Sequence, residues 1–232
     1  MNETNYLQFF DGKLFKVMNY IYWIFMTSTL FLLTNILLIF STYALVMASK
    51  EMPISIFHLI IIGIFTIPVG PSLAAMYDVM NKIIQNQEVS VIKDFFKGYR
   101  RHFRQSVGLS CILVFLTIIT VMNYFILQQS QDMGFMLLPL LAVISLIMCV
   151  SLYTFQFVSL KKFTMKEIGK LSLYFSIKEF KTTIMMLISA ALCIYLMLLI
   201  PTVTIFLFPG IYCFVSTFLL QKVNKKIVSS TI

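Results

Sequence analysis

Charged residues are scarce in this chain. Asp, Glu, Lys and Arg make up only 12% of its 232 residues, whereas an average soluble domain carries about 25%. Hydrophobic residues make up 59%, and the mean hydropathy is +0.92. So little polar surface cannot cover a water-soluble globule, and the apolar surplus therefore predicts a surface that faces lipid.

Residues typical of catalytic and metal sites are also few. The chain has two histidines and four cysteines, and no CxxC or HExxH spacing connects them. No GxSxG or P-loop sequence occurs. We therefore expect no enzymatic activity, no metal and no cofactor. The net charge of +9 does not indicate nucleic acid, because the basic residues flank apolar runs instead of forming one patch.

Long uncharged runs make up most of the sequence. A membrane-spanning helix needs only about 20 apolar residues. The run over 182–221 is long enough for two crossings, and Pro201 near its middle is a natural place to turn. The runs predict a single all-α domain, a polytopic membrane helix bundle with about six transmembrane helices. The predicted spans are 18–47, 54–82, 105–128, 134–160, 182–200 and 202–220.

The basic residues predict the orientation of these spans. All but one (Lys50) of the 18 Lys and Arg residues fall in the N-terminal segment, the second connection, the fourth connection or the C-terminal tail. Segments rich in Lys and Arg stay on the cytoplasmic side of a membrane. We therefore expect a multi-pass protein of the cell membrane with both termini in the cytoplasm.

Two cytoplasmic connections carry helical patterns of their own. Over 91–104, apolar residues such as Phe95, Tyr99 and Phe103 recur at steps of three and four, and over 164–175 Thr164 and Glu167 have capping-box spacing. Both segments are predicted to be amphipathic interfacial helices that face anionic lipid or a partner. The basic residues of this candidate surface are Lys93, Lys97, Arg100, Arg101, Arg104, Lys166 and Lys170.

The sequence Pro68-Val69-Gly70-Pro71 predicts an interruption of the second span. Two prolines without backbone donors and one glycine disfavour a continuous helix there, so we expect a second half-helix that starts near Pro71. Broken helices expose backbone groups and a partial positive charge. The interruption is either a site for a solute or an ion, or a structural kink that neighbouring spans hold.

Asp78 is the one acidic residue near the inside of a span, two turns after Pro71. A carboxylate within a membrane is a functional candidate by default. Lys82 follows at i+4, so a local Asp78–Lys82 ion pair is the alternative explanation.

Three amides lie within other spans: Asn35, Asn123 and Gln156. Such side chains commonly connect membrane helices through hydrogen bonds. We expect them to serve helix packing.

Residues 65–79 (FTIPVGPSLAAMYDV) and 94–103 (DFFKGYRRHF) resemble the YesL-like family of bacterial membrane proteins. That family carries a Thr-Ile-Gly-Pro-Ala-Thr-Ala-Ala-Leu-Tyr type segment followed by an aromatic and basic stretch, and Asn35 with its apolar neighbours is similar to the family's Asn-Leu-Leu stretch. The extra Pro68-Val69 before Gly70-Pro71 departs from the family pattern. Members of the family commonly lie beside carbohydrate ABC-importer genes in Gram-positive bacteria.

The resemblance implies a non-enzymatic accessory protein of the bacterial cell membrane. It would support carbohydrate uptake by contacting the permease or ATPase subunits of an ABC importer, besides the lipid bilayer itself. The alternative is a small solute transporter or channel that uses the interruption around Pro68–Pro71. A third interpretation is a membrane enzyme that acts on lipid or glycan.

Overall fold

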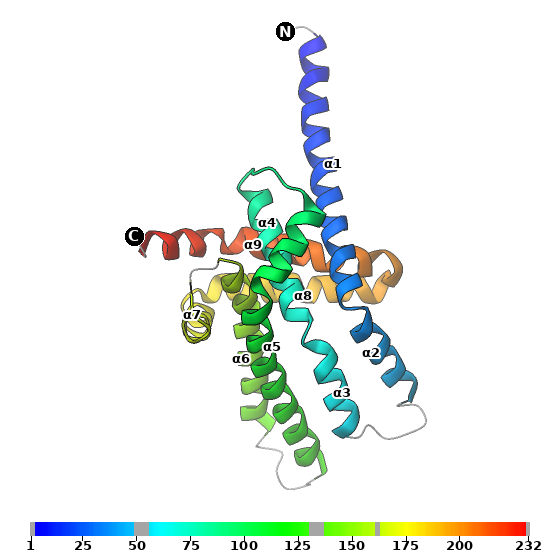
Figure 1. The fold of residues 1–232 in the computed structure, drawn as a ribbon, viewed down its shortest axis with the longest axis vertical. Helices are drawn as coiled ribbons and strands as arrows, with labels where there is room; N and C mark the ends of the chain where they lie inside the picture. Colours follow the sequence, from blue (N-terminus) through cyan, green and yellow to red (C-terminus); the bar gives the residue numbers. More distant parts are fainter. Residues whose placement is uncertain (1–2, 49–55, 130–136, 161–162, 231–232) are drawn as a thin grey trace.

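The computed structural model of the protein describes residues 3–48, 56–129, 137–160 and 163–230, and every regular element in these ranges is an α-helix (Figure 1). Lys50 and the predicted starts of two spans, at residues 54 and 134, lie outside the described residues. In chain order the helices are α1 (Glu3–Thr34), α2 (Ile36–Ala48), α3 (Ile56–Thr66), α4 (Val69–Ile84), α5 (Val91–Gln129), α6 (Leu137–Ser159), α7 (Met165–Lys178), α8 (Phe180–Leu199) and α9 (Pro201–Ser230).

Six helical stretches are long and apolar enough to cross a membrane. They are Phe15–Thr34, Ile60–Ile84, Val91–Leu127, Leu138–Ser159, Phe180–Leu199 and Thr204–Gln221. The predicted number of spans is therefore confirmed. The predicted turn near Pro201 is confirmed as well, because α8 ends at Leu199 and α9 starts at Pro201.

The second connection differs from the prediction. Residues 91–104 do not form a separate interfacial helix before a span at 105–128, because α5 runs unbroken from Val91 to Gln129. Its 39 residues extend about 58 Å, almost twice the hydrocarbon thickness. Phe95 and His102 are buried against the bundle whereas Phe103 is exposed, so the buried face coincides only in part with the predicted apolar face.

The first span is also not the single helix over 18–47 that hydropathy predicts. It divides at Asn35 into α1 and the shorter apolar helix α2. The backbone N–H of Asn35 is shared between the carbonyls of Phe31 and Leu32, and Ile39 donates to the carbonyl of Asn35. These bonds keep the interruption short.

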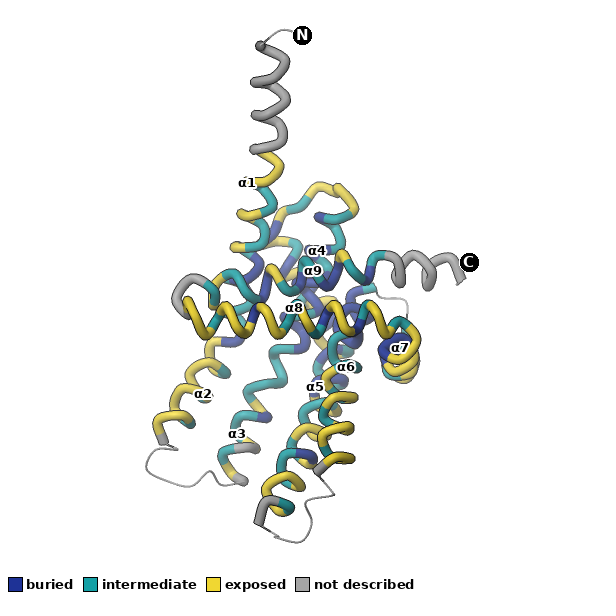
Figure 2. The backbone as a smooth tube through the Cα atoms, turned by 180° about the vertical axis from the view of Figure 1, so that it is seen from behind, coloured by how far each residue is buried: buried dark blue, intermediate teal, exposed yellow. Residues whose placement is uncertain are grey.

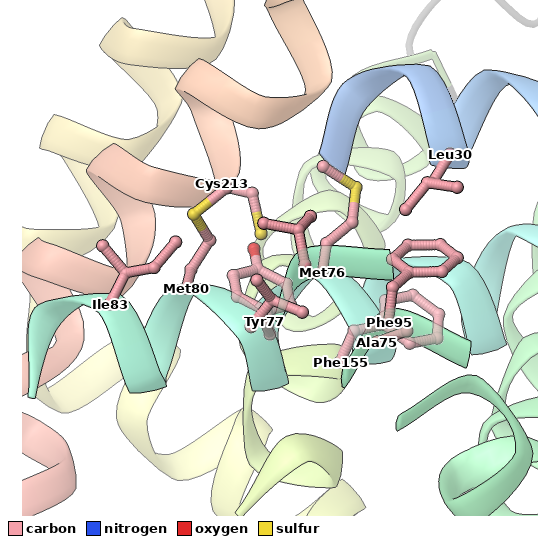
Figure 3. Packing of buried hydrophobic residues seen from close by; sticks show 11 residues of the cluster. Leu30, Ala75, Met76, Tyr77, Met80, Ile83, Phe95, Phe155 and Cys213 are labelled. Carbon is pink, nitrogen blue, oxygen red and sulfur yellow. The ribbon is translucent and has the colours of Figure 1, made fainter. Parts of the chain in front are cut away.

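Helix α4 lies at the centre of the bundle (Figure 2). Ten of its 16 residues are buried, and it contacts α1, α5, α6 and α9. Met76, Tyr77 and Met80 project from it among Leu30 of α1 and Cys213 of α9 (Figure 3). The small residues Ala74 and Ala75 are fully buried and let the neighbouring backbones approach α4 closely.

A second group of buried side chains joins α6 and α7 to α8 and α9. Phe157 of α6 meets Phe175 of α7 edge to face, with ring centroids 5.8 Å apart. Tyr153 of α6 is hydrogen-bonded to Thr183 of α8, with 2.7 Å between the oxygens. The hairpin of α8 and α9 runs across α5 and α6 instead of along them, so the helices form a crossed bundle (Figure 1).

Candidate functional site

At the interruption of the second span, the backbone carbonyls that the prolines leave without a donor accept other hydrogen bonds. Helix α3 ends at Thr66 and α4 starts at Val69, slightly before the predicted start near Pro71. Pro68 and Pro71 have no N–H to donate to the carbonyls of Ile64 and Ile67. Instead Ile67 donates to Ile64 O (3.2 Å) and Gly70 donates to Ile67 O (3.4 Å).

Gly70 lies where three helices meet. A Cβ atom on Gly70 would lie 1.8 Å from Ser110 Oγ, 3.1 Å from the backbone oxygen of Ser106 and 2.8 Å from Phe155 Cε1. Only glycine allows α4 to approach α5 and α6 this closely. The neighbouring helices therefore hold the interruption in place by direct packing.

A cavity of about 290 Å³ lies beside the interruption, between α3, α5 and α6. Gly63, Thr66 and Gly70 line it from the second span, and Ser110, Val114 and Phe155 are among the residues on its other walls. The hydroxyl of Thr66 is bonded to Ile62 O (2.7 Å) within its own helix, so the walls offer little polarity. Asp78 is not among the lining residues.

Asp78 pairs across helices instead of along its own. Its Oδ2 lies 3.5 Å from Arg101 Nη1 and 3.8 Å from His102 Nε2, both on α5. Gly98 makes room for this contact, because a Cβ there would lie 3.1 Å from Asp78 Oδ2 and 3.3 Å from the Cα of Ala75. Two glycines, Gly70 and Gly98, thus bring α4 and α5 together.

The predicted Asp78–Lys82 ion pair is therefore wrong. Lys82 Nζ lies 2.6 Å from Asp94 Oδ1, and the other oxygen of Asp94 accepts from the backbone N–H of Ser90 (3.1 Å). The i+4 spacing places Asp78 and Lys82 on one face of α4. The start of α5 supplies a competing acid there, and the hydrogen bond from Ser90 orients that acid.

Asn35 connects two helices, as predicted. Its Nδ2 donates to Ser72 Oγ (2.8 Å) and to Phe31 O (2.8 Å), and the side chain is buried. The bond links the division between α1 and α2 to the first turn of α4. Ser72, which directly follows the Pro68–Pro71 sequence, was not predicted as a partner of Asn35.

Gln156 connects helices too, whereas Asn123 does not. Gln156 is fully buried and donates from Nε2 to Asn81 Oδ1 (3.4 Å), and Asn81 donates to Ser159 Oγ (3.0 Å). Asn123 is exposed and donates to Ile119 O (2.9 Å) in its own helix, so the prediction was wrong for this residue. Its position in an apolar run did not tell which face of α5 it occupies.

A further helix contact, at Pro209 and Gly210, was not predicted. Pro209 lies inside α9, and the N–H of Gly210 donates to Ser28 Oγ of α1 (2.8 Å). A Cβ on Gly210 would lie 2.5 Å from Ile24 O. Adjacent proline and glycine residues within an apolar run were the available signal, as they were at Gly70-Pro71.

The predicted capping box starts α7. Thr164 Oγ1 accepts from the N–H of Glu167, and Glu167 Oε2 accepts from the N–H of Thr164 (2.7 Å). The hydrogen bond from the backbone N–H of Thr164, followed by the interaction with the Thr164 side chain, lowers the pKa of the Glu167 carboxyl below its ordinary value of 4.5. Helix α7 then extends to Lys178, three residues beyond the predicted end.

The two basic segments come together in space. Gln105 Nε2 of α5 donates to the carbonyl of Phe163, directly before α7 (2.7 Å), and Gly108 lies against Met165. Arg101, a member of this set, also contacts Asp78. All seven predicted surface residues are exposed: Lys93, Lys97, Arg100, Arg101, Arg104, Lys166 and Lys170.

Nothing in the described ranges gathers three His, Cys, Asp or Glu side chains where they could share a metal ion. The helices, their apolar exposed faces and the six span-length segments define an all-α, multi-pass membrane helix bundle.

Residues 18–124 match the family described as protein of unknown function, DUF624. The matched segment contains both divided spans and most of α5. No curated protein and no solved structure matches the chain.

Proposed function

We propose that this protein is a non-enzymatic accessory protein of the bacterial cell membrane that supports carbohydrate uptake by associating with an ABC importer. YesL-like proteins carry the family that matches residues 18–124, and the two segments that resemble them lie at 65–79 and 94–103. The proposed orientation has both termini and the basic ends of α5 and α7 in the cytoplasm.

The observation that carries the proposal is the meeting of the two basic segments at Gln105 and Phe163. The seven exposed Lys and Arg residues above belong to these two segments, and we infer that they act as one cationic surface, which we call the basic surface. Such a surface suits an acidic region of a partner or anionic lipid. The importer subunits are the proposed partner, and lipid contact alone is the competing explanation.

Co-purification from native membranes in mild detergent tests the association directly. We expect permease or ATPase subunits of a carbohydrate importer to be recovered with the tagged protein. Recovery of no importer subunit under conditions that preserve a known importer complex would count against the accessory role.

A charge-reversal variant tests the surface. Lys97→Glu, Arg100→Glu and Arg104→Glu together should reduce co-purification and uptake, and Arg101 is left unchanged because it contacts Asp78. Lys16→Glu with Lys181→Glu is the control, since these exposed lysines lie outside the basic surface. If the triple variant co-purifies as well as the control, the basic surface contacts lipid only.

The cavity beside Gly70 favours a second candidate, a small solute transporter. Proteoliposomes that contain this protein alone would then show solute flux, and filling the cavity with Val114→Phe would reduce it. Gly70→Val is a poor test, because any side chain at Gly70 collides with Ser110 and Phe155. The low polarity of the cavity walls makes this the weaker of the two candidates.

A further inference from the structure

Three polar side chains occupy consecutive turns of α5 on the side that faces α4. They are His102, Ser106 and Ser110, which are 2%, 0% and 3% exposed. Within the described part of the chain, His102 Nε2 and both serine hydroxyls lack a hydrogen-bond partner. Leaving such a buried group unpaired is unfavourable, so three in one row call for a ligand that the protein atoms do not supply.

One end of this row reaches Asp78. His102 Nε2 lies 3.8 Å and Arg101 Nη1 lies 3.5 Å from Asp78 Oδ2, both longer than the about 2.7–3.2 Å of a direct hydrogen bond. Polar groups at such separations are commonly bridged by water. The side chains of Asp78 and Arg101 are 16% and 35% exposed, so this end opens at the basic surface.

The other end of the row reaches the interruption of the second span. Ser110 lines the cavity beside Gly70, and Ser106 contributes the backbone oxygen against which Gly70 packs. From His102 to Ser110 the row covers about 12 Å of helix, close to half of a hydrocarbon core that is about 30 Å thick.

We propose that water molecules occupy this row and form a hydrated path from the basic surface to the interruption at Gly70. A buried water typically makes about three hydrogen bonds, and Asp78, His102, Ser106 and Ser110 supply such partners at successive turns. Gly70 packs directly against Ser110, so the proposed path is one for water and protons and not for a sugar. The apolar cavity beyond Ser110 stays dry, and the path ends there.

The competing arrangement is that each serine rotates to bond a carbonyl one turn earlier in α5. Thr117 and Thr120 do so on the same helix, with distances of 2.8 and 2.7 Å to Leu113 O and Leu116 O. In that case the row is dry. The proposal does not depend on the accessory role, and the two can fail separately.

The first experiment uses the wild-type protein in nanodiscs. Hydroxyl radicals generated by X-rays at bound water mark the side chains beside it, and mass spectrometry locates the marks. We expect modification of His102 to exceed that of Met186, which is 0% exposed in the second group of buried side chains, although methionine is intrinsically more reactive. If His102 is as unmodified as Met186, the row is dry and the proposal is wrong.

The second experiment uses Ser106→Cys and Ser110→Cys with a small methanethiosulfonate reagent, which reacts with the thiolate. Ser216→Cys is the matched control, because Ser216 is equally buried and is bonded to the hydroxyl of Tyr77 (3.1 Å). Burial without water suppresses the thiolate, so we expect both row variants to react at least about tenfold faster than the control. Peptide mapping separates the four native cysteines.

Reaction at Ser106→Cys and Ser110→Cys no faster than at Ser216→Cys would overturn the proposal. If a cysteine variant does not fold, the footprinting of the wild-type protein decides.

Discussion

Asn35 on the first span donates from Nδ2 to the hydroxyl of Ser72 on the second span, with 2.8 Å between the atoms. Each residue lies at or directly beside an interruption of its own span. Ser72 Oγ also lies 2.9 Å from Val69 O and 3.1 Å from Pro68 O. The two interrupted helices are therefore connected by a buried hydrogen bond where their backbones are irregular.

A double-mutant cycle on this pair should give a clear coupling energy. We expect Asn35→Ala and Ser72→Ala to be coupled by about 0.6–1.7 kcal/mol, the range found for hydrogen bonds between membrane helices. The free energy of unfolding in an SDS titration, followed by circular dichroism, is the measurement. Asn123→Ala is the control and should change stability little, because Asn123 is exposed and bonds only within α5. Equal losses for Asn35→Ala and Asn123→Ala would contradict the prediction.

Gly70→Ala should destabilise the protein by about 1–3 kcal/mol, the usual cost of overpacking. Its Cβ would lie 1.8 Å from Ser110 Oγ and 2.8 Å from a ring atom of Phe155. The matched control is Gly169→Ala, where no atom lies within 4 Å of the added Cβ and the helix gains propensity, so stability should hold or rise. Unfolding midpoints of the two variants in detergent provide the comparison. A stable Gly70→Ala variant would mean that α4 does not pack directly against α5.

Lys82 should be coupled to Asp94 and not to Asp78. For the partly buried Lys82–Asp94 pair we expect a coupling of about 0.5–1 kcal/mol from the variants Lys82→Met and Asp94→Asn. The same cycle between Lys82→Met and Asp78→Asn should give a value near zero. The reverse outcome would restore the ion pair that the i+4 spacing suggests.

Ser28→Ala should leave the N–H of Gly210 unpaired inside the membrane. The bond from Gly210 N to Ser28 Oγ is 2.8 Å long, so we expect a loss of about 1–3 kcal/mol in the free energy of unfolding. Ser41→Ala serves as the control, because Ser41 Oγ bonds only Leu38 O in its own helix. Indistinguishable unfolding curves would mean that another group satisfies Gly210.

The Glu167 carboxyl should titrate below its ordinary value of 4.5, because the charged form accepts the hydrogen bond from the N–H of Thr164. A lowered pKa in the folded state stabilises the start of α7 above pH 4.5, and this contribution is lost as the pH falls through the folded pKa. Carbon-13 NMR of the labelled carboxyl measures the titration. Thr164→Ala removes the side-chain contribution but keeps the backbone N–H, so it should raise the pKa only part of the way toward 4.5, whereas Thr164→Ser should preserve it. An unshifted pKa in the wild-type protein would exclude the capping box in solution.

Composition and local spacing predicted much of this architecture. The uncharged runs predicted six spans, and Pro201 predicted the turn between α8 and α9. The spacing of Thr164 and Glu167 predicted the start of α7. These features depend on neighbours in sequence: a spanning helix bonds its own backbone, and a capping box closes within four residues. The interruption at Pro68 could be predicted for the same reason, because a proline lacks a backbone donor whatever its tertiary surroundings.

The sequence by itself therefore determined that this chain is a multi-pass helical membrane protein with an interrupted second span. Only the tertiary structure decided which side chains meet: Asp78 with Arg101 and His102, Lys82 with Asp94, and Asn35 with Ser72. In an apolar run, periodicity scarcely distinguishes the lipid face from the protein face, because both are hydrophobic. Which face of a helix packs against protein depends instead on two features of the tertiary structure. These are the close backbone contacts that glycine allows and the buried hydrogen bonds, and the glycines are Gly70, Gly98 and Gly210.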